Sequence, residues 1–91
     1  MNWEILFRDA VPKVAGVVVY DKGAQDARGR FCIAKTMQLP NGQMRTTQSN
    51  RKQRPAALRL ARNWLASRAK IMGVEYVPGA GAGTLLFKPI N

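Results

Sequence analysis

The chain has 91 residues, of which 46% are hydrophobic and 22% charged, and its 15 Lys and Arg against 5 Asp and Glu leave a formal net charge of +10. This length supports one domain, residues 1–91, and the apolar content argues against global disorder. A domain this basic attracts polyanions, while the lack of histidine and the single cysteine, Cys32, exclude an intrachain disulfide and a Cys/His metal site.

The first predicted element runs from Trp3 to Val11 and ends at Pro12. Apolar residues spaced by three and four favour a short amphipathic helix, although the Ile5-Leu6-Phe7 triplet also suits a buried strand, so both alternatives stay open. Charges interrupt this segment, and no window approaches the roughly 18 apolar residues of a membrane span. We expect a cytoplasmic protein in a reducing compartment, with no membrane partner.

Two strands and a tight turn are predicted next. The β-branched run from Val14 to Tyr20 indicates a buried strand, and a polar loop separates it from a second strand, Arg30 to Leu39. Lys35 falls on the apolar face of the second strand, which requires either a bulge or a lysine stem that reaches past an edge. The Pro40-Asn41-Gly42 turn then leads into a third, polar strand from Gln43 to about Gln48.

A helix is predicted from Pro55 to about Met72, because proline suits a first helical turn and Gly73 suits a helix end. Its core stripe is expected to contain Ala57, Leu58, Ala61, Trp64, Leu65, Ala69 and Met72. Strands at 74–77 and 84–88 would form a terminal hairpin around the Gly-Ala segment, interpreted as a flexible loop. The fold class is therefore α+β: a three-stranded antiparallel meander packed on one main helix in the C-terminal half.

Catalytic side chains are scarce. Asp21 and Asp26 share one polar loop and are interpreted as solvated turn residues rather than a metal site, and Cys32 lacks an imidazole that could activate it. We expect no enzyme activity, no metal and no cofactor.

The basic residues are concentrated between Asp26 and Glu75, an interval that holds 11 cations and no acid. One group surrounds the predicted helix start, where free backbone amides also attract phosphate: Arg51, Lys52, Arg54, Arg59 and Arg62. A second group, expected to read base edges, comes from the central hairpin with Gln43 and Thr47: Arg28, Arg30 and Arg45. Because a two-stranded ribbon fits a DNA major groove, DNA is favoured over RNA.

The aromatic residues bear on single-strand binding, since stacking on bases needs an exposed ring. Trp64 is expected in the core, with Trp3 and Phe7 as packing partners. Phe31 and Tyr20 are the better stacking candidates, although each also suits a buried sheet face.

Three nucleic-acid architectures resemble parts of the chain. The order of three strands and a helix, with Tyr20-Asp21-Lys22-Gly23, Gly29-Arg30-Phe31, Asn41-Gly42 and Trp64-Leu65, resembles the arm-binding domain of tyrosine integrases. With a helical N-terminus, Ser49, its following basic residues and Ala56-Ala57 resemble the double-stranded-RNA-binding domain, from which Pro55 departs. The Gly29-Arg30-Phe31 strand start is similar to that of the purine-rich-element-binding repeat. We transfer no activity from these resemblances.

The sequence is compatible with two functions. The first is a non-enzymatic accessory or regulatory nucleic-acid-binding factor of bacterial or phage type. Its affinity for nucleic acid should fall steeply as the salt concentration rises. The second is an inhibitor or adaptor whose basic face docks on an acidic protein. Exposed apolar residues at 84–87 would favour the second function or a homodimer.

Overall fold

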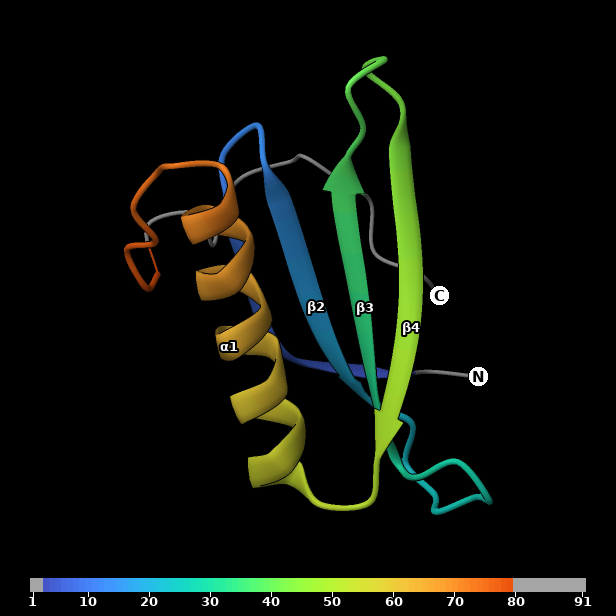
Figure 1. The fold of residues 1–91 in the computed structure, drawn as a ribbon. Coiled ribbons are helices and arrows are strands. Elements are labelled where there is room, and N and C mark those ends of the chain that lie inside the picture. Colours follow the sequence, from blue (N-terminus) through green and yellow to red (C-terminus); the bar gives the residue numbers. More distant parts are fainter. Residues whose placement is uncertain (1–2, 80–91) are drawn as a thin grey trace.

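Four consecutive strands form one antiparallel sheet, and a single helix packs on one of its faces (Figure 1). The computed structural model describes residues 3–79. The elements are β1 (Glu4–Val11), β2 (Ala15–Asp21), β3 (Phe31–Gln38), β4 (Met44–Arg51) and α1 (Arg54–Ile71), and the strands lie in the order β1-β2-β3-β4. The predicted α+β class is confirmed, with one more strand in the meander than the three expected.

The additional strand is β1, the segment for which the spacing favoured a helix. Its pairing with β2 is interrupted by a bulge between Ile5 and Phe7. A bulge adds one residue to one strand and so shifts the alternation of its side chains. Trp3 therefore packs against one side of the sheet, whereas Leu6 and Phe7 both pack against the other, so the apolar residues of β1 lack the alternation of a regular strand.

Strand β2 is buried along its whole length, as the β-branched run predicts. Ala15, Val17 and Val19 point to the helix side and join the main core, while Val18 and Tyr20 belong to a second cluster on the opposite side with Cys32 and Ala34. Trp3 packs on this second cluster, with its ring 5.5 Å from that of Tyr20 in an edge-on arrangement. The sheet thus has an apolar centre on both faces.

The β3–β4 hairpin forms at the predicted turn. The N–H of Gly42 donates to the carbonyl of Leu39 at 2.9 Å, and Gly42 has a φ of 87°, which glycine adopts without strain. Pairing of β3 is continuous on both sides, so no bulge accompanies Lys35. Its ammonium donates to the hydroxyl of Ser49 on the edge strand β4 at 2.9 Å, so the side chain reaches toward an edge, as in the second alternative, but ends on β4 rather than past it.

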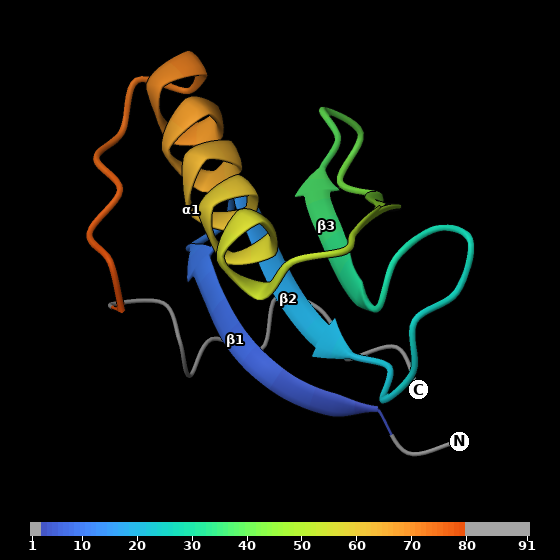
Figure 2. The same cartoon turned by 90° about the horizontal axis from the view of Figure 1, so that it is seen from below.

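Helix α1 packs mainly on the central strand β2 and next on β3, with fewer contacts to the edge strands β1 and β4 (Figure 2). Its fully buried residues, Ala57, Ala61, Leu65 and Ala69, recur every fourth position, so a narrow stripe of mostly small side chains faces the sheet. The helix ends at Ile71 and is followed by Gly73 with a positive φ of 71°, and the N–H of Val74 donates to the carbonyl of Ala69 at 2.9 Å, as in a Schellman motif. Met72 was expected in the core stripe, but it lies beyond the last helical turn and is 55% exposed.

The segment at 74–77 is not a strand, contrary to the prediction. It is held by side-chain contacts to β1: the Tyr76 hydroxyl donates to the buried Asp9 carboxylate at 2.7 Å, and the Gly79 N–H donates to it at 2.9 Å. The remaining part of the predicted hairpin, at 84–88, and most of the Gly-Ala segment lie outside the described residues.

Candidate nucleic-acid interface

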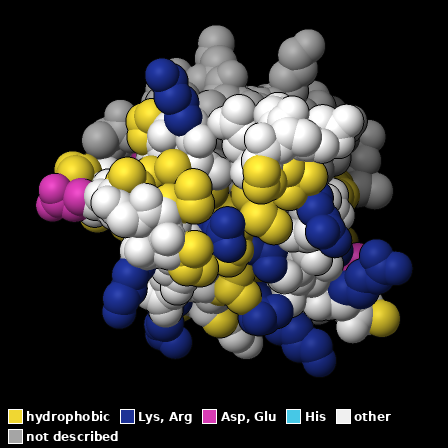
Figure 3. Space-filling model, turned by 45° about the horizontal axis from the view of Figure 1, so that its top comes forward, with side chains coloured by type: hydrophobic (Ala, Val, Ile, Leu, Met, Phe, Trp, Pro, Cys, Tyr) yellow, Lys and Arg dark blue, Asp and Glu magenta, His cyan; other side chains and the backbone are white. Residues whose placement is uncertain are grey.

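Strand β4 and helix α1 form a continuous basic unit with no acidic residue. Of the five acids in the chain, Asp9 and Asp21 are buried and Asp26 is ion-paired with Lys22 at 2.7 Å. Glu4 and Glu75 are the exposed acids that remain. On the face shown in Figure 3, Lys and Arg side chains are spread between apolar ones, whereas acidic side chains appear only at the margins.

Arg30 and Arg54 lie around Asp21, at the end of β2. Arg30 makes two hydrogen bonds to the Asp21 carboxylate, at 2.6 and 3.0 Å, and the Arg54 guanidinium lies 4.0 Å from it. The hydrogen bond from Arg30 is the main reason that the pKa of Asp21 lies below its usual value, with a further contribution from the Gly23 N–H. Arg30, expected to read bases, is therefore engaged within the fold, whereas the Arg54 side chain stays 56% exposed.

The β2–β3 loop lies against the connection between β4 and α1. A Cβ atom on Gly29 would lie only 2.5 Å from the Arg51 carbonyl oxygen, so the two backbones approach too closely for any other residue. The Gln25 amide also reaches the Lys52 carbonyl, at 3.4 Å. This contact brings Arg28 to the same end of the molecule as Arg51 and Lys52, which are both exposed.

A shallow groove of about 400 Å³ begins at the first turn of α1 and carries three arginines. Its lining residues are Arg54, Pro55, Leu58, Arg59, Arg62 and Asn63. The Gln53 side chain does not cap the helix, and the first turn contains no acid, so the positive end of the helix adds to the arginine charge. The structure thus places three of the five residues predicted around the helix start along this groove, Arg54, Arg59 and Arg62, and the other two, Arg51 and Lys52, lie just before the helix. The Arg62 guanidinium also lies over the Phe7 ring, 5.2 Å from its centroid.

Arg45 stands apart from the other predicted readout residues. It pairs with Met37 near the Gly42 turn, whereas Arg51 pairs with Phe31 at the other end of the same strands. Six residues of strand separate Arg45 from Arg51, or about 20 Å at the usual rise. Because β3 also pairs with β2 along its length, the hairpin is not a free ribbon, and the predicted insertion of Arg28, Arg30 and Arg45 together into a groove is not supported by this geometry.

The predicted stacking residues are unsuitable, because Phe31 is 7% exposed and Tyr20 is 1% exposed. Phe31 packs in the main core, with the guanidinium groups of Arg30 and Arg54 5.7 and 6.0 Å from its ring centroid. Trp64 packs against the main core as expected. Its predicted partner Trp3 lies instead on the opposite side of the sheet.

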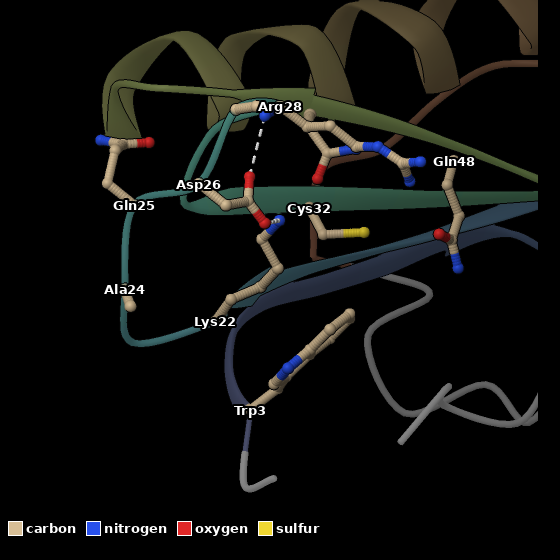
Figure 4. A pocket seen from close by; sticks show the side chains of 10 residues that line it. Trp3, Lys22, Ala24, Gln25, Asp26, Arg28, Cys32 and Gln48 are labelled. Atoms are coloured by element: carbon tan, nitrogen blue, oxygen red, sulfur yellow. Dashed lines mark hydrogen bonds and ion pairs between the residues drawn. The ribbon is translucent and has the colours of Figure 1, made fainter.

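A second cavity, of about 550 Å³, lies on the sheet face opposite α1 (Figure 4). It is lined by Trp3, Lys22, Ala24, Gln25, Asp26, Ala27, Arg28, Cys32, Gln48 and Asn50. Of these, only Arg28 was predicted as a site residue. Gln48 and Asn50 are two residues apart on β4, so the sequence could have placed both on one face of the sheet. It could not have placed Trp3 beside them, because the position of Trp3 depends on the bulge in β1.

Asp21, Asp26 and Cys32, the residues considered for catalysis, are engaged in hydrogen bonds or buried. Asp26 accepts hydrogen bonds from Lys22, Arg28 and Gly29, and Cys32 is buried, which raises the pKa of its thiol. Asp21 and Asp26 are therefore structural residues of the loop rather than simply solvated ones. Among residues 3–79, no three Cys, Asp or Glu side chains gather as metal ligands would.

Comparison with known proteins gives no assignment: no family model matches the chain, and no characterised protein or solved structure matches it significantly. Within the described part of the chain, no helix combines the length and apolar character needed to cross a membrane. The order of four strands followed by a helix disagrees with the helix-first order of the double-stranded-RNA-binding domain. It keeps the sheet-then-helix order of the other two resemblances.

Proposed function

We propose that this chain is a small non-enzymatic nucleic-acid-binding protein that holds phosphates at the first turns of α1 and at the connection leading into it. The observation that carries the proposal is the arginine-lined groove at an uncapped, acid-free helix start. Phosphate is the anion best matched to guanidinium groups beside a helix N-terminus, because both donate hydrogen bonds to its oxygens.

The distribution of acids supports the same function. A basic face that only kept the protein dissolved would carry both charge signs. Here residues 27–74 contain no acid, and the buried Asp21 is hydrogen-bonded to Arg30 and lies 4.0 Å from Arg54, whereas no acid of the described residues is paired with Arg59 or Arg62. The exposed cations therefore keep their attraction for an extended polyanion.

Fluorescence anisotropy with labelled oligonucleotides at two salt concentrations tests the proposal. Affinity should fall steeply with salt, and removing one cation that neutralises a phosphate should reduce the slope on a duplex by about 0.9. Arg59→Gln combined with Arg62→Gln should lower affinity for all sequences alike. Lys13→Gln combined with Arg45→Gln removes the same charge at the opposite end of the sheet and should have a much smaller effect.

Two results would overturn the proposal. The first is that the wild-type protein binds neither single-stranded nor duplex oligonucleotides at low salt. The second is that the two double variants weaken binding equally. The second result would mean that the groove at α1 has no special part in binding and that only total charge matters.

Docking on an acidic protein is the alternative function. It is favoured by apolar side chains exposed at the end of the basic helix and just after it: Ile71, Met72, Val74 and Val77 are 67, 55, 46 and 52% exposed. Retention of a partner from nuclease-treated lysate, with no oligonucleotide binding, would select this alternative.

A further inference from the structure

The cavity on the sheet face opposite α1 is separate from the arginine groove. Its floor includes the buried Cys32 of β3, and one side is formed by Gln48 and Asn50 of the neighbouring strand β4. The β2–β3 loop supplies Arg28, and Trp3 comes from the residue just before β1. Figure 4 shows the Arg28 and Trp3 side chains on opposite sides of the Cys32 sulfur.

The lining combines three kinds of chemistry. Trp3 is a flat aromatic side chain, half-buried at the cavity wall. Gln25, Gln48 and Asn50 carry amides that can both donate and accept hydrogen bonds. Arg28 adds a positive charge, since Asp26 is bonded to its backbone N–H and to the Lys22 ammonium rather than to its guanidinium.

These features fit an unpaired nucleobase better than a cation or an apolar ligand. The only carboxylate in the lining, that of Asp26, already accepts hydrogen bonds from Lys22, Arg28 and Gly29, so a metal ion would find few open oxygens. An aromatic wall with amide groups beside it is the usual means of recognising a base by its face and its edge. The volume lies within the range of ligand-binding cavities.

We propose that this cavity takes one unpaired base of a single-stranded nucleic acid, with Trp3 against the base, Gln48 or Asn50 at its edge and Arg28 at the adjoining phosphate. The inference rests on the proposed function, and it adds that the protein distinguishes single strands from duplexes. In a duplex the bases are stacked and paired, so none can enter the cavity without being unpaired at a free-energy cost.

Tryptophan fluorescence tests whether the base reaches the cavity. In a Trp64→Phe background, Trp3 is the one tryptophan of the chain. Titration with a single-stranded oligonucleotide should quench its emission at the concentrations at which anisotropy reports binding, and a duplex of equal length should quench it far less. Binding without any quenching would overturn the base assignment while leaving the proposed function intact.

Two matched pairs of variants test the recognition. Arg28→Ala and Arg45→Ala each remove one exposed arginine, but only Arg28 lines the cavity. Gln48→Ala and Thr47→Ala alter neighbouring exposed positions of β4 that face opposite sides of the sheet. Arg28→Ala should weaken single-strand binding more than Arg45→Ala does, and Gln48→Ala should weaken it about fivefold or more with Thr47→Ala close to wild type.

The controls separate the two hypotheses. If both members of each pair behave alike while the wild type still binds oligonucleotides, the cavity does not hold a base and the groove at α1 accounts for binding. If no oligonucleotide binds at low salt, the proposed function itself is wrong. A loss with Gln48→Ala on single strands and not on duplexes would support the base site specifically.

Discussion

Gly29 allows the β2–β3 loop to touch the connection before α1, so its replacement should be unusually costly. In Gly29→Ala, the new Cβ would lie 2.5 Å from the carbonyl oxygen of Arg51 and 2.6 Å from its carbonyl carbon. The φ of 119° adds strain for any residue with a Cβ, about 1–2 kcal/mol. Displacing a packed backbone adds about 1–3 kcal/mol. We therefore expect a loss of about 3.5 kcal/mol in the free energy of unfolding, the sum of the two middle values.

Gly42→Ala is the matched control. Gly42 also has a positive φ, 87°, but no atom lies within 4 Å of its added Cβ, so only the conformational cost applies. Urea unfolding followed by circular dichroism should show Gly29→Ala as the less stable variant by about 1–3 kcal/mol. In thermal unfolding each kcal/mol corresponds to about 4–8 °C for a domain of this size. Equal stabilities of the two variants would refute the close backbone contact.

Two further predictions concern pH. Because Arg30 holds the pKa of the Asp21 carboxyl below its usual 3.8, the pair stabilises the fold above that value, and this contribution is lost as pH falls through the lower folded-state pKa. Asp21→Asn should reduce stability at neutral pH and flatten its loss in acid, measured by urea unfolding at several pH values. Burial and the neighbouring Asp9 raise the pKa of Tyr76 from 10.0 to about 12, so stability should be lost as pH rises through that interval. Tyr76→Phe should be less stable than the wild type below pH 10.0, and the difference should disappear toward 12.

The elements that the sequence predicts well are those with local causes. The β3–β4 turn depends on Gly42, which tolerates its positive φ, and on Asn41, whose side-chain oxygen accepts a hydrogen bond from the Gln43 N–H at 3.0 Å. Helix α1 begins beside Pro55 and ends at Ile71, two residues before Gly73, and both signals act within one turn of the helix. These boundaries needed no knowledge of tertiary contacts.

The open and the wrong predictions have tertiary causes. The sequence left Trp3 to Val11 open between helix and strand, and the bulge that puts Trp3 and Phe7 on opposite sides of the sheet depends on the pairing of β1 with β2. The segment around Tyr76 has strand-forming residues, but its position depends on a hydrogen bond to Asp9, 67 residues earlier. Neither effect is contained in a local window of sequence.

The candidate site shows the same division. The concentration of cations at the start of α1 follows from the helix boundary and the positions of Arg54, Arg59 and Arg62, so it was predictable. The sequence could not show which of the chain's cations remain free to bind a ligand. Arg30, for example, is hydrogen-bonded to Asp21 across the β2–β3 loop. The cavity was missed because it unites residues from Trp3 to Asn50, and only strand order brings them together.

The two proposed sites lie on opposite faces of the sheet but near the same end, where the Gln25 amide touches the Lys52 backbone. A duplex is stiff over about 150 base pairs and cannot turn around such an edge, whereas a single strand can. One single strand could then contact the α1 groove, pass the exposed Arg51 and Lys52, and place a base in the cavity. Arg28→Ala and the Arg59→Gln, Arg62→Gln pair should accordingly have additive effects on the free energy of binding a long single strand. On a duplex, the added loss from Arg28→Ala should be no larger than that from Arg45→Ala, and an excess loss there would show that Arg28 acts on phosphates alone.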